Sequence, residues 1–404
     1  MNIRYNLLEN RERALQILAL STLLFFFIGD LAKFISKTFD LGFQEYPRIS
    51  KLVVFTLIGL YILWYKVYKS SYARPLILIL ILFVFTYLIN NLSLKDVDFF
   101  SNITSNFDYF IKASLLPFML IPFFTIDEVT VKKCLKLILV LFWINAITII
   151  IGSIFNIETL ETYYKGSRFG YKGIYNRSTF VSYLFLFVIM YYYYNWRNKS
   201  KTKTLLILLL ASIISLQVGT KRIYIFLGCL FIFHFINAKL YKKYYFWGVL
   251  VLFSLITVKY YNIVSNFLSV KFEILITVYN NHGFISALTS YRIDLLRDYY
   301  NVYITNNWSS LNYFVGGAFF HKIRPEMDFI DLYLLLGLVG IIAYLYIFYK
   351  YIFNFNTKNK TLLFMFVMII LLAFTSSGII ISGNFAILLI VFRSYYYIEN
   401  KNTK

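Results

Sequence analysis

The chain has 404 residues, of which 60% are hydrophobic and only 15% are charged. This balance excludes a soluble protein of that length, because so few charged side chains cannot cover its surface. A formal net charge of +21 would ordinarily point to nucleic acid, but the positions of the charges argue against that partner, as shown below.

Hydrophobic runs near 20 residues recur along the chain, and we count twelve of them. Each is long enough to cross a hydrocarbon core about 30 Å thick. Since a backbone in lipid must satisfy its own hydrogen bonds, the runs are expected to be helices. The sequence therefore predicts an all-α polytopic integral membrane protein, with residues 1–404 as a single transmembrane domain. The runs are 14–36, 50–68, 75–91, 108–126, 134–155, 178–196, 204–219, 222–238, 244–262, 328–349, 361–376 and 383–398.

The basic residues follow the topology of these runs. With the N-terminus placed in the cytoplasm, each short inner segment carries three or four Lys or Arg, such as Lys132, Lys133 and Lys136. This bias is the positive-inside rule. The net charge is therefore a topology signal, both termini are predicted to be cytoplasmic, and no nucleic-acid partner is expected. The first run lacks a small-residue cleavage site, so we expect it to remain as an anchor.

Residues 263–327 interrupt the hydrophobic pattern between the ninth and tenth runs, and the same sorting places this polar stretch outside the membrane. Apolar residues recur with a helical period from Leu288 to Tyr303, which predicts an amphipathic surface helix near 290–303. Thr289 and Ser290 are the expected N-caps. Arg292 would lie in the first turn, where a guanidinium and free N–H groups can bind phosphate. The alternatives are an ion pair of Arg292 with Asp294 or Glu273, or a contact with lipid headgroups.

Two further groups of residues could carry chemistry. Lys221 and Arg222 follow a tight outer turn, Gly219-Thr220, and either bind an anion or reach lipid headgroups. The tenth run begins with three acids, Glu326, Asp328 and Asp331, preceded by Arg324 and His321. Acids stabilise a helix start, but Asp331 lies deep enough to need a partner or a cavity. A functional carboxylate is therefore expected here.

Other polar residues give weaker signals. Asp30 and Lys112 lie in or near the membrane, and they are either functional or neutralise one another. Asp96 and Asp98 form a short acidic pair in an outer loop that could hold a metal. No metal-ligand cluster and no Gly-rich phosphate loop stands out, so we expect neither a metal nor another cofactor.

Three segments together resemble the bacterial O-antigen and capsular polysaccharide polymerases, which share a superfamily with the O-antigen ligases. Gly219-Thr220-Lys221-Arg222 resembles the arginine-bearing outer turn of that family. Ser290-Tyr291-Arg292, followed by Gly316-Gly317, resembles the motif of its large outer loop, although Tyr291 replaces the usual glycine. The segment 326–340 resembles the loop-to-helix junction. The ligases carry His-Asn where this chain has Glu326-Met327, which favours a polymerase.

The resemblance implies about twelve transmembrane helices in the bacterial inner membrane, with one long extracytoplasmic loop between helices 9 and 10. It also implies a glycosyltransferase that moves a growing polymer from undecaprenyl diphosphate onto a sugar hydroxyl of the next lipid-linked repeat unit. Neither metal nor nucleotide is needed. The donor and acceptor oligosaccharides and the membrane lipids are the expected partners, with a chain-length regulator and a flippase as further candidates.

Roles for the residues follow from that reaction. Arg222 and Arg292 are expected to stabilise the departing diphosphate, with Lys221 and Arg324 as further binding residues. Glu326 is the first choice for the base that activates the acceptor hydroxyl, and Asp328 is the second. His321, Arg297 and Asp331 are secondary candidates.

Two other functions stay open. An O-antigen ligase belongs to the same enzyme class. A lipid-linked oligosaccharide flippase, or another transporter, also has many spans and basic cavities. Transporters usually interrupt helices in matching positions of two halves. Pro117 and Pro122 in the fourth run hint at an interruption, but the second half shows no counterpart in sequence.

Overall fold

The computed structural model describes residues 2–42, 45–95, 97–163, 169–320, 322–353 and 359–402. Each of the twelve hydrophobic runs coincides with a helix, so the all-α prediction is confirmed. These helices are α1 (Asn2–Phe39), α2 (Tyr46–Trp64), α3 (Ala73–Ser93), α4 (Phe99–Phe123), α5 (Glu128–Phe155), α6 (Ser178–Lys199), α7 (Thr202–Leu216), α8 (Lys221–Asn237), α9 (Tyr244–Lys259), α14 (Asp328–Ile347), α15 (Lys360–Thr375) and α16 (Gly383–Asn402).

Five helices are long and apolar enough to cross a membrane, by length and composition. They span Asn10–Phe39, Tyr46–Trp64, Ala73–Ser93, Glu128–Phe155 and Asp328–Ile352. The last of these includes a π-helical turn, Phe348–Ile352, that extends α14. Shorter apolar helices coincide with α7, α9 and α15. Among the described residues, these apolar helices are compatible with a membrane protein.

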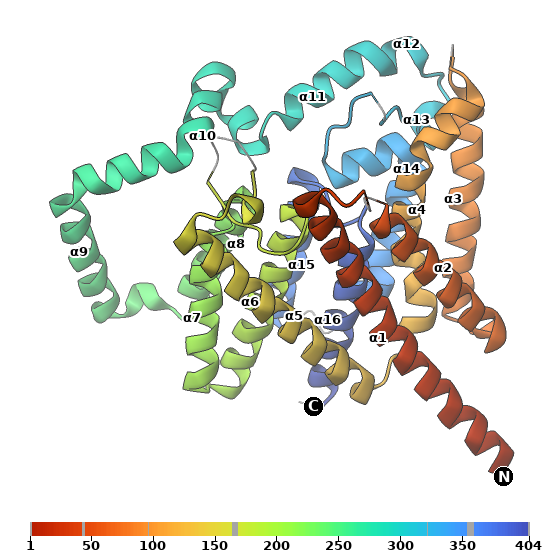
Figure 1. Cartoon of the computed structure of the whole chain (residues 1–404), viewed down its shortest axis with the longest axis horizontal. Helices are drawn as coiled ribbons and strands as arrows, with labels where there is room; N and C mark the ends of the chain where they lie inside the picture. Colours follow the sequence, from red (N-terminus) through yellow and green to blue (C-terminus); the bar gives the residue numbers. More distant parts are fainter. Residues whose placement is uncertain are drawn as a thin grey trace.

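The centre of the bundle is made by α6 and α16. The side chains from Phe180 to Met190 are all buried, as are those from Phe385 to Phe392. A helix that is apolar and buried on every side belongs to the core of a large bundle. α16 contacts α1, α4, α5 and α6. Figure 1 shows the two chain termini at one end of this bundle and α10 to α13 at the opposite end.

The polar stretch 263–327 is itself largely helical. α10 (Tyr261–Thr289) contains a break at Gly283, where φ is 82°. It is followed by α11 (Arg292–Tyr299), the π turn Tyr300–Ile304, α12 (Thr305–Asn307) and α13 (Asn312–Val315). The expected surface helix near 290–303 is thus present. The expected N-caps are wrong, because Ser290 and Tyr291 both adopt left-handed conformations and Tyr291 precedes the helix without a side-chain cap.

A cluster of buried asparagines ties the end of this stretch to the bundle. Asn106 of α4 donates to Ala318 O (2.9 Å) and accepts from Phe320 N (3.2 Å). Asn312 donates to Asn90 O (3.2 Å), and Asn90 of α3 donates to Leu335 O of α14 (2.6 Å). These buried amides replace backbone pairing where the chain is not helical. The segment that leads to Arg324 is therefore held firmly against α3, α4 and α14.

A close backbone approach joins the same segment to α14. Gly337 interrupts α14 with φ 62°, and Gly316 has φ 85°. A Cβ on Gly316 would lie 2.8 Å from Gly337 N and 2.8 Å from Leu334 O. Gly317 N donates to Leu334 O at 2.7 Å. Gly316-Gly317 and Gly337 lie in two of the segments that resemble the family. They meet in one contact, where loop backbone packs into the break in α14.

Candidate functional site

Three of the predicted site residues come together at the end of the bundle that carries α10 to α13. Arg292 Nη2 lies 3.5 Å from Glu326 Oε2. Arg222 stacks over the ring of Tyr183, with 5.4 Å from its Cζ to the ring centroid. Tyr183 is a buried residue of α6 and hydrogen-bonds Ser376 Oγ at 3.1 Å. The tight turn and the loop helix therefore both bring a cation near Tyr183 of the central helix, and Arg292 joins them to Glu326 in the junction before α14.

Arg292 is only partly satisfied by the protein. Its side chain is 17% exposed, and its Nη1 donates to Thr289 O at 3.3 Å. Its Nε is buried without a hydrogen-bond partner among the described residues. Burial lowers the pKa of Arg292, the positive charge of Arg222 lowers it further, and Glu326 partly offsets both. Two arginines held this close favour an anion between them.

The other predicted cations have different surroundings. Lys221 Nζ donates to Ala287 O at 2.5 Å, which ties the start of α8 to the end of α10. Arg297 is exposed on α11 and does not join the cluster. His321 lies outside the described residues. Arg324 is held by Asp331, whose Oδ2 is 2.8 Å from Nε and 2.6 Å from Nη2.

The three acids at the start of α14 have separate environments. Asp328 is fully buried, and its carboxylate accepts hydrogen bonds from Gly378 N (2.9 Å), Ile379 N (2.5 Å) and Ile380 N (3.1 Å). Those bonds occupy both oxygens, which fits an anchor for the backbone rather than a base. Asp331 is fully buried against Arg324. Glu326, with 55% of its side chain exposed, is the one that a substrate can reach.

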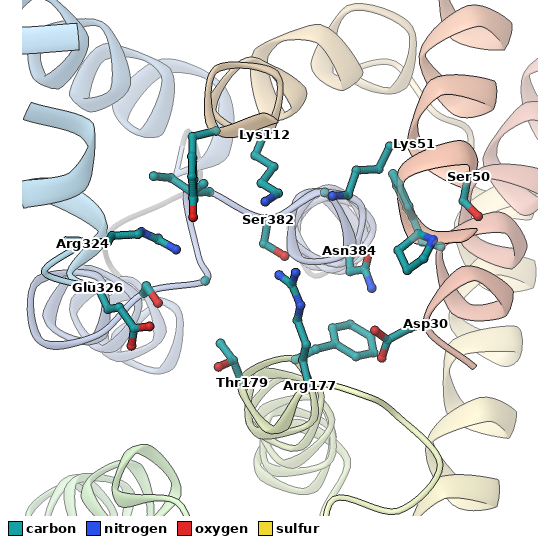
Figure 2. Close-up of a pocket in the computed structure, with 18 residues that line it drawn as sticks. Asp30, Ser50, Lys51, Lys112, Arg177, Thr179, Arg324, Glu326, Ser382 and Asn384 are labelled. Carbon is teal, nitrogen blue, oxygen red and sulfur yellow. The ribbon is translucent and has the colours of Figure 1, made fainter. Parts of the chain in front are cut away.

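A cavity of about 320 Å³ lies beside this cluster, and Figure 2 shows polar side chains pointing into it from several helices. Lys51 of α2, Lys112 of α4, Arg177 before α6 and Arg324 supply four cations. The lining acids are Asp30 and Glu326. Residues 377–382, between α15 and α16, and the first turn of α16 complete the lining with Ser377, Gly378, Ser382 and Asn384. Glu326 belongs to both the cavity and the pair with Arg292.

The cations of the cavity are held in place by groups behind them. Lys112 pairs with Asp108 one turn earlier on α4, and Lys51 Nζ lies 3.6 Å from the same carboxylate. The guanidinium of Arg324 stacks on Tyr109, with 5.0 Å from Cζ to the ring centroid. Although burial opposes its charge, the carboxylates of Asp331 and Asp328 raise the pKa of Arg324. Ammonium and guanidinium groups fixed in this way can bind an anion without first being ordered.

Some of these residues were not predicted as a site from sequence. Lys51, Arg177 and the segment 377–384 were missed. Lys51 and Arg177 could have been found, because basic residues are disfavoured on the side of the membrane where the sequence places them.

The alternative in which Asp30 and Lys112 neutralise one another is wrong. Asp30 accepts from Asn176 N at 3.1 Å, while Lys112 pairs with Asp108. Asp98 caps α4 by accepting from Ser101 N at 2.7 Å, and Asp96 lies outside the described residues.

The structure is a helical bundle, compatible with a membrane protein, with a cation-lined pocket at the end opposite its termini. The described part of the chain contains no group of three or more His, Cys, Asp or Glu placed to hold a metal. The chain matches no protein-family model, no curated protein and no solved structure. Any function must therefore be argued from the residues themselves.

Proposed function

We propose that the protein is a polysaccharide polymerase, which transfers a growing polymer from undecaprenyl diphosphate onto a sugar hydroxyl of the next lipid-linked repeat unit. The observation that carries the proposal is the cavity in which Lys51, Lys112, Arg177 and Arg324 converge, next to the pair of Arg292 and Glu326. Two linked phosphates carry several negative oxygens, and fixed ammonium and guanidinium groups are their usual protein ligands.

The reaction assigns a task to each group. Glu326 accepts the proton of the acceptor hydroxyl, whose oxygen then bonds to the anomeric carbon of the donor. The bond from that carbon to the diphosphate oxygen breaks, and the lipid diphosphate leaves as an anion. Arg222 and Arg292 stabilise the charge that develops on it, and Arg324 and Lys221 hold the surroundings in place. The donor brings its own activated bond, so neither ATP nor a metal enters the scheme.

The proposal places all twelve apolar helices across the bacterial inner membrane, with both termini in the cytoplasm. The stretch 263–327 is then an extracytoplasmic loop. One ion pair between two helix ends that the sequence predicts to be cytoplasmic supports this orientation. Lys199 at the end of α6 lies 3.6 Å from Glu399 near the end of α16, and both helices end where Figure 1 shows the termini. The cation-lined cavity is at the other end, on the side where the polymer is assembled.

A lipid-linked oligosaccharide flippase is the second candidate, and one observation favours it. The break at Gly337 interrupts α14, a helix of the second half. Transporters bind substrates where helices are interrupted. An O-antigen ligase remains the alternative within the enzyme class, although the exposed base here is a glutamate.

Gel analysis of surface glycan in a deletion strain separates these functions. A polymerase defect leaves one repeat unit attached and removes the ladder of longer chains. Loss of that single unit as well indicates a ligase or a flippase. Complementation with Arg222→Ala, Arg292→Ala or Glu326→Gln, each at wild-type protein level, tests the residues. Arg297→Ala is the matched control, because Arg297 is exposed on α11 away from the cluster. A ladder of normal length from all three site variants would refute the assignment.

A further inference from the structure

Arg393 is a buried cation at the far end of the bundle from the cavity described above. It lies on α16 and is 8% exposed. Its guanidinium packs over two rings, with 4.5 Å from Cζ to the centroid of Phe124 and 5.1 Å to that of Tyr397. Its one hydrogen bond to a described residue runs from Nη1 to Phe124 O at 3.4 Å. That carbonyl is free to accept because α4 ends at Phe123.

No carboxylate of a described residue lies within ion-pair distance of Arg393. Lys112, the other buried lysine or arginine among the described residues, is paired with Asp108. Two partly exposed arginines also have a carboxylate partner, since Arg324 pairs with Asp331 and Arg292 with Glu326. A charge removed from water without a counter-charge is costly. Binding of an anion would therefore stabilise Arg393, and the described part of the chain does not supply that anion.

A cavity of about 590 Å³ opens beside Arg393, between the end of α4, the start of α5 and the last turns of α16. Ser394 lines it, and the hydroxyl of this 3%-exposed residue has no hydrogen-bond partner among the described residues. Lys401 adds a second cation. Glu128 also lines the cavity, but its carboxylate is 2.6 Å from Lys132 Nζ.

We propose that this cavity binds a phosphate oxyanion, as carried by the headgroup of an anionic phospholipid or by a soluble phosphate compound. A phosphate offers several acceptor oxygens, which suit a guanidinium, a hydroxyl and an ammonium arranged around one space. The two rings contact the guanidinium without accepting its hydrogen bonds, and Phe124 O accepts one of them. The site is independent of the polymerase proposal. It lies toward the other end of α16 and shares no lining residue with the cavity around Lys51, Lys112 and Arg324.

Thermal unfolding of the purified full-length protein in a non-ionic detergent tests this site. The added probes are dioctanoyl phosphatidylglycerol, dioctanoyl phosphatidylcholine and inorganic phosphate, each in a separate titration. The midpoint is expected to rise with phosphatidylglycerol and not with phosphatidylcholine. In Arg393→Gln the phosphatidylglycerol concentration needed for the same rise increases at least about tenfold. If inorganic phosphate gives the same rise with the same dependence on Arg393, the ligand is a soluble phosphate compound.

Two matched variants keep the test decisive. Arg74→Gln removes an exposed cation in the first turn of α3 and should respond as the wild type does. Ser394→Ala removes only the unpartnered hydroxyl, and it should weaken the response even if Arg393→Gln fails to fold. The proposal is overturned by an undiminished response in both Arg393→Gln and Ser394→Ala. A wild-type protein that responds to neither phosphate probe overturns it as well.

Discussion

The guanidinium of Arg292 lies 3.5 Å from the carboxylate of Glu326, which joins the start of α11 to the approach of α14. Both residues are partly accessible, and Glu326 also lines the cation-rich cavity. Under the proposed function, this ion pair would have two roles. It would position the carboxylate in the free protein, and it would release the arginine to the diphosphate when a substrate arrives.

We expect Glu326→Gln to reduce polymerisation by about 10²–10⁴ in rate, which is the usual contribution of a general base. The amide keeps the size and the hydrogen-bonding reach of the side chain but cannot take a proton. Turnover of a lipid-linked repeat unit by purified protein measures the effect. The double variant Arg292→Glu with Glu326→Arg restores the ion pair without restoring the chemistry. Recovery of activity in the double variant would mean that the pair is only structural.

We expect Lys112→Met to raise the KM for the lipid-linked donor about tenfold, because one charge-assisted contact to the diphosphate is lost. Methionine keeps the length of the side chain, and Asp108 keeps Lys51 as a partner at 3.6 Å. The same turnover assay over a range of donor concentrations checks the shift. Lys95→Met is the control, since Lys95 is exposed before α4 and does not line the cavity. An unchanged KM in Lys112→Met would remove Lys112 from the binding site.

We expect Asp328→Asn to destabilise the fold by about 3 kcal/mol, because three backbone N–H groups lose a charged acceptor in a buried place. One end of the amide is itself a donor and faces N–H groups that also donate. The midpoint of thermal unfolding in detergent should fall, and the yield of folded protein with it. Asp298→Asn changes an exposed acid on α11 and should leave the midpoint unchanged. A normally stable Asp328→Asn protein would return Asp328 to the list of candidate bases.

We expect Gly337→Ala to prevent stable folding, since a Cβ there would lie 2.5 Å from Val315 N in a left-handed conformation. Gly228→Ala in α8 is the control, because its Cβ would meet no atom within 4 Å. Alanine also favours a helix over glycine by about 1 kcal/mol. Monodispersity on size-exclusion chromatography after extraction compares the two. Similar profiles for both variants would show that the loop does not need the break in α14.

The helices and part of the site were predictable from sequence, because both depend on local patterns. Long apolar runs become helices wherever they are solvated by lipid or packed inside a bundle. Arg222, Arg292 and Glu326 were recognisable because each stands next to a turn or a helix start. The sequence could not rank Glu326 above Asp328 on physical grounds, since the two acids stand almost side by side at one junction. The two acids differ because residues 378–380, which follow the end of α15, donate hydrogen bonds to Asp328 and bury it. Glu326 receives no such cover and stays exposed.

The convergence of the cavity cations was beyond the reach of sequence patterns. Lys51, Lys112, Arg177 and Arg324 belong to four separate segments, and no spacing along the chain relates them. Their meeting depends on how α4 and α6 pack against α16 and how α2 packs against α4. The left-handed backbone of Ser290 and Tyr291 was also unforeseen, since neither residue prefers it.

Residues 377–384 form one wall of the cavity, and they follow all four of its cations along the chain. A polypeptide that stops after α14 therefore carries Lys51, Lys112, Arg177 and Arg324 but lacks that wall. The cavity becomes enclosed only when the segment before α16 and the first turn of α16 pack into the bundle, where α16 contacts α4 and α6. During synthesis, the cations are thus present before the space that they line.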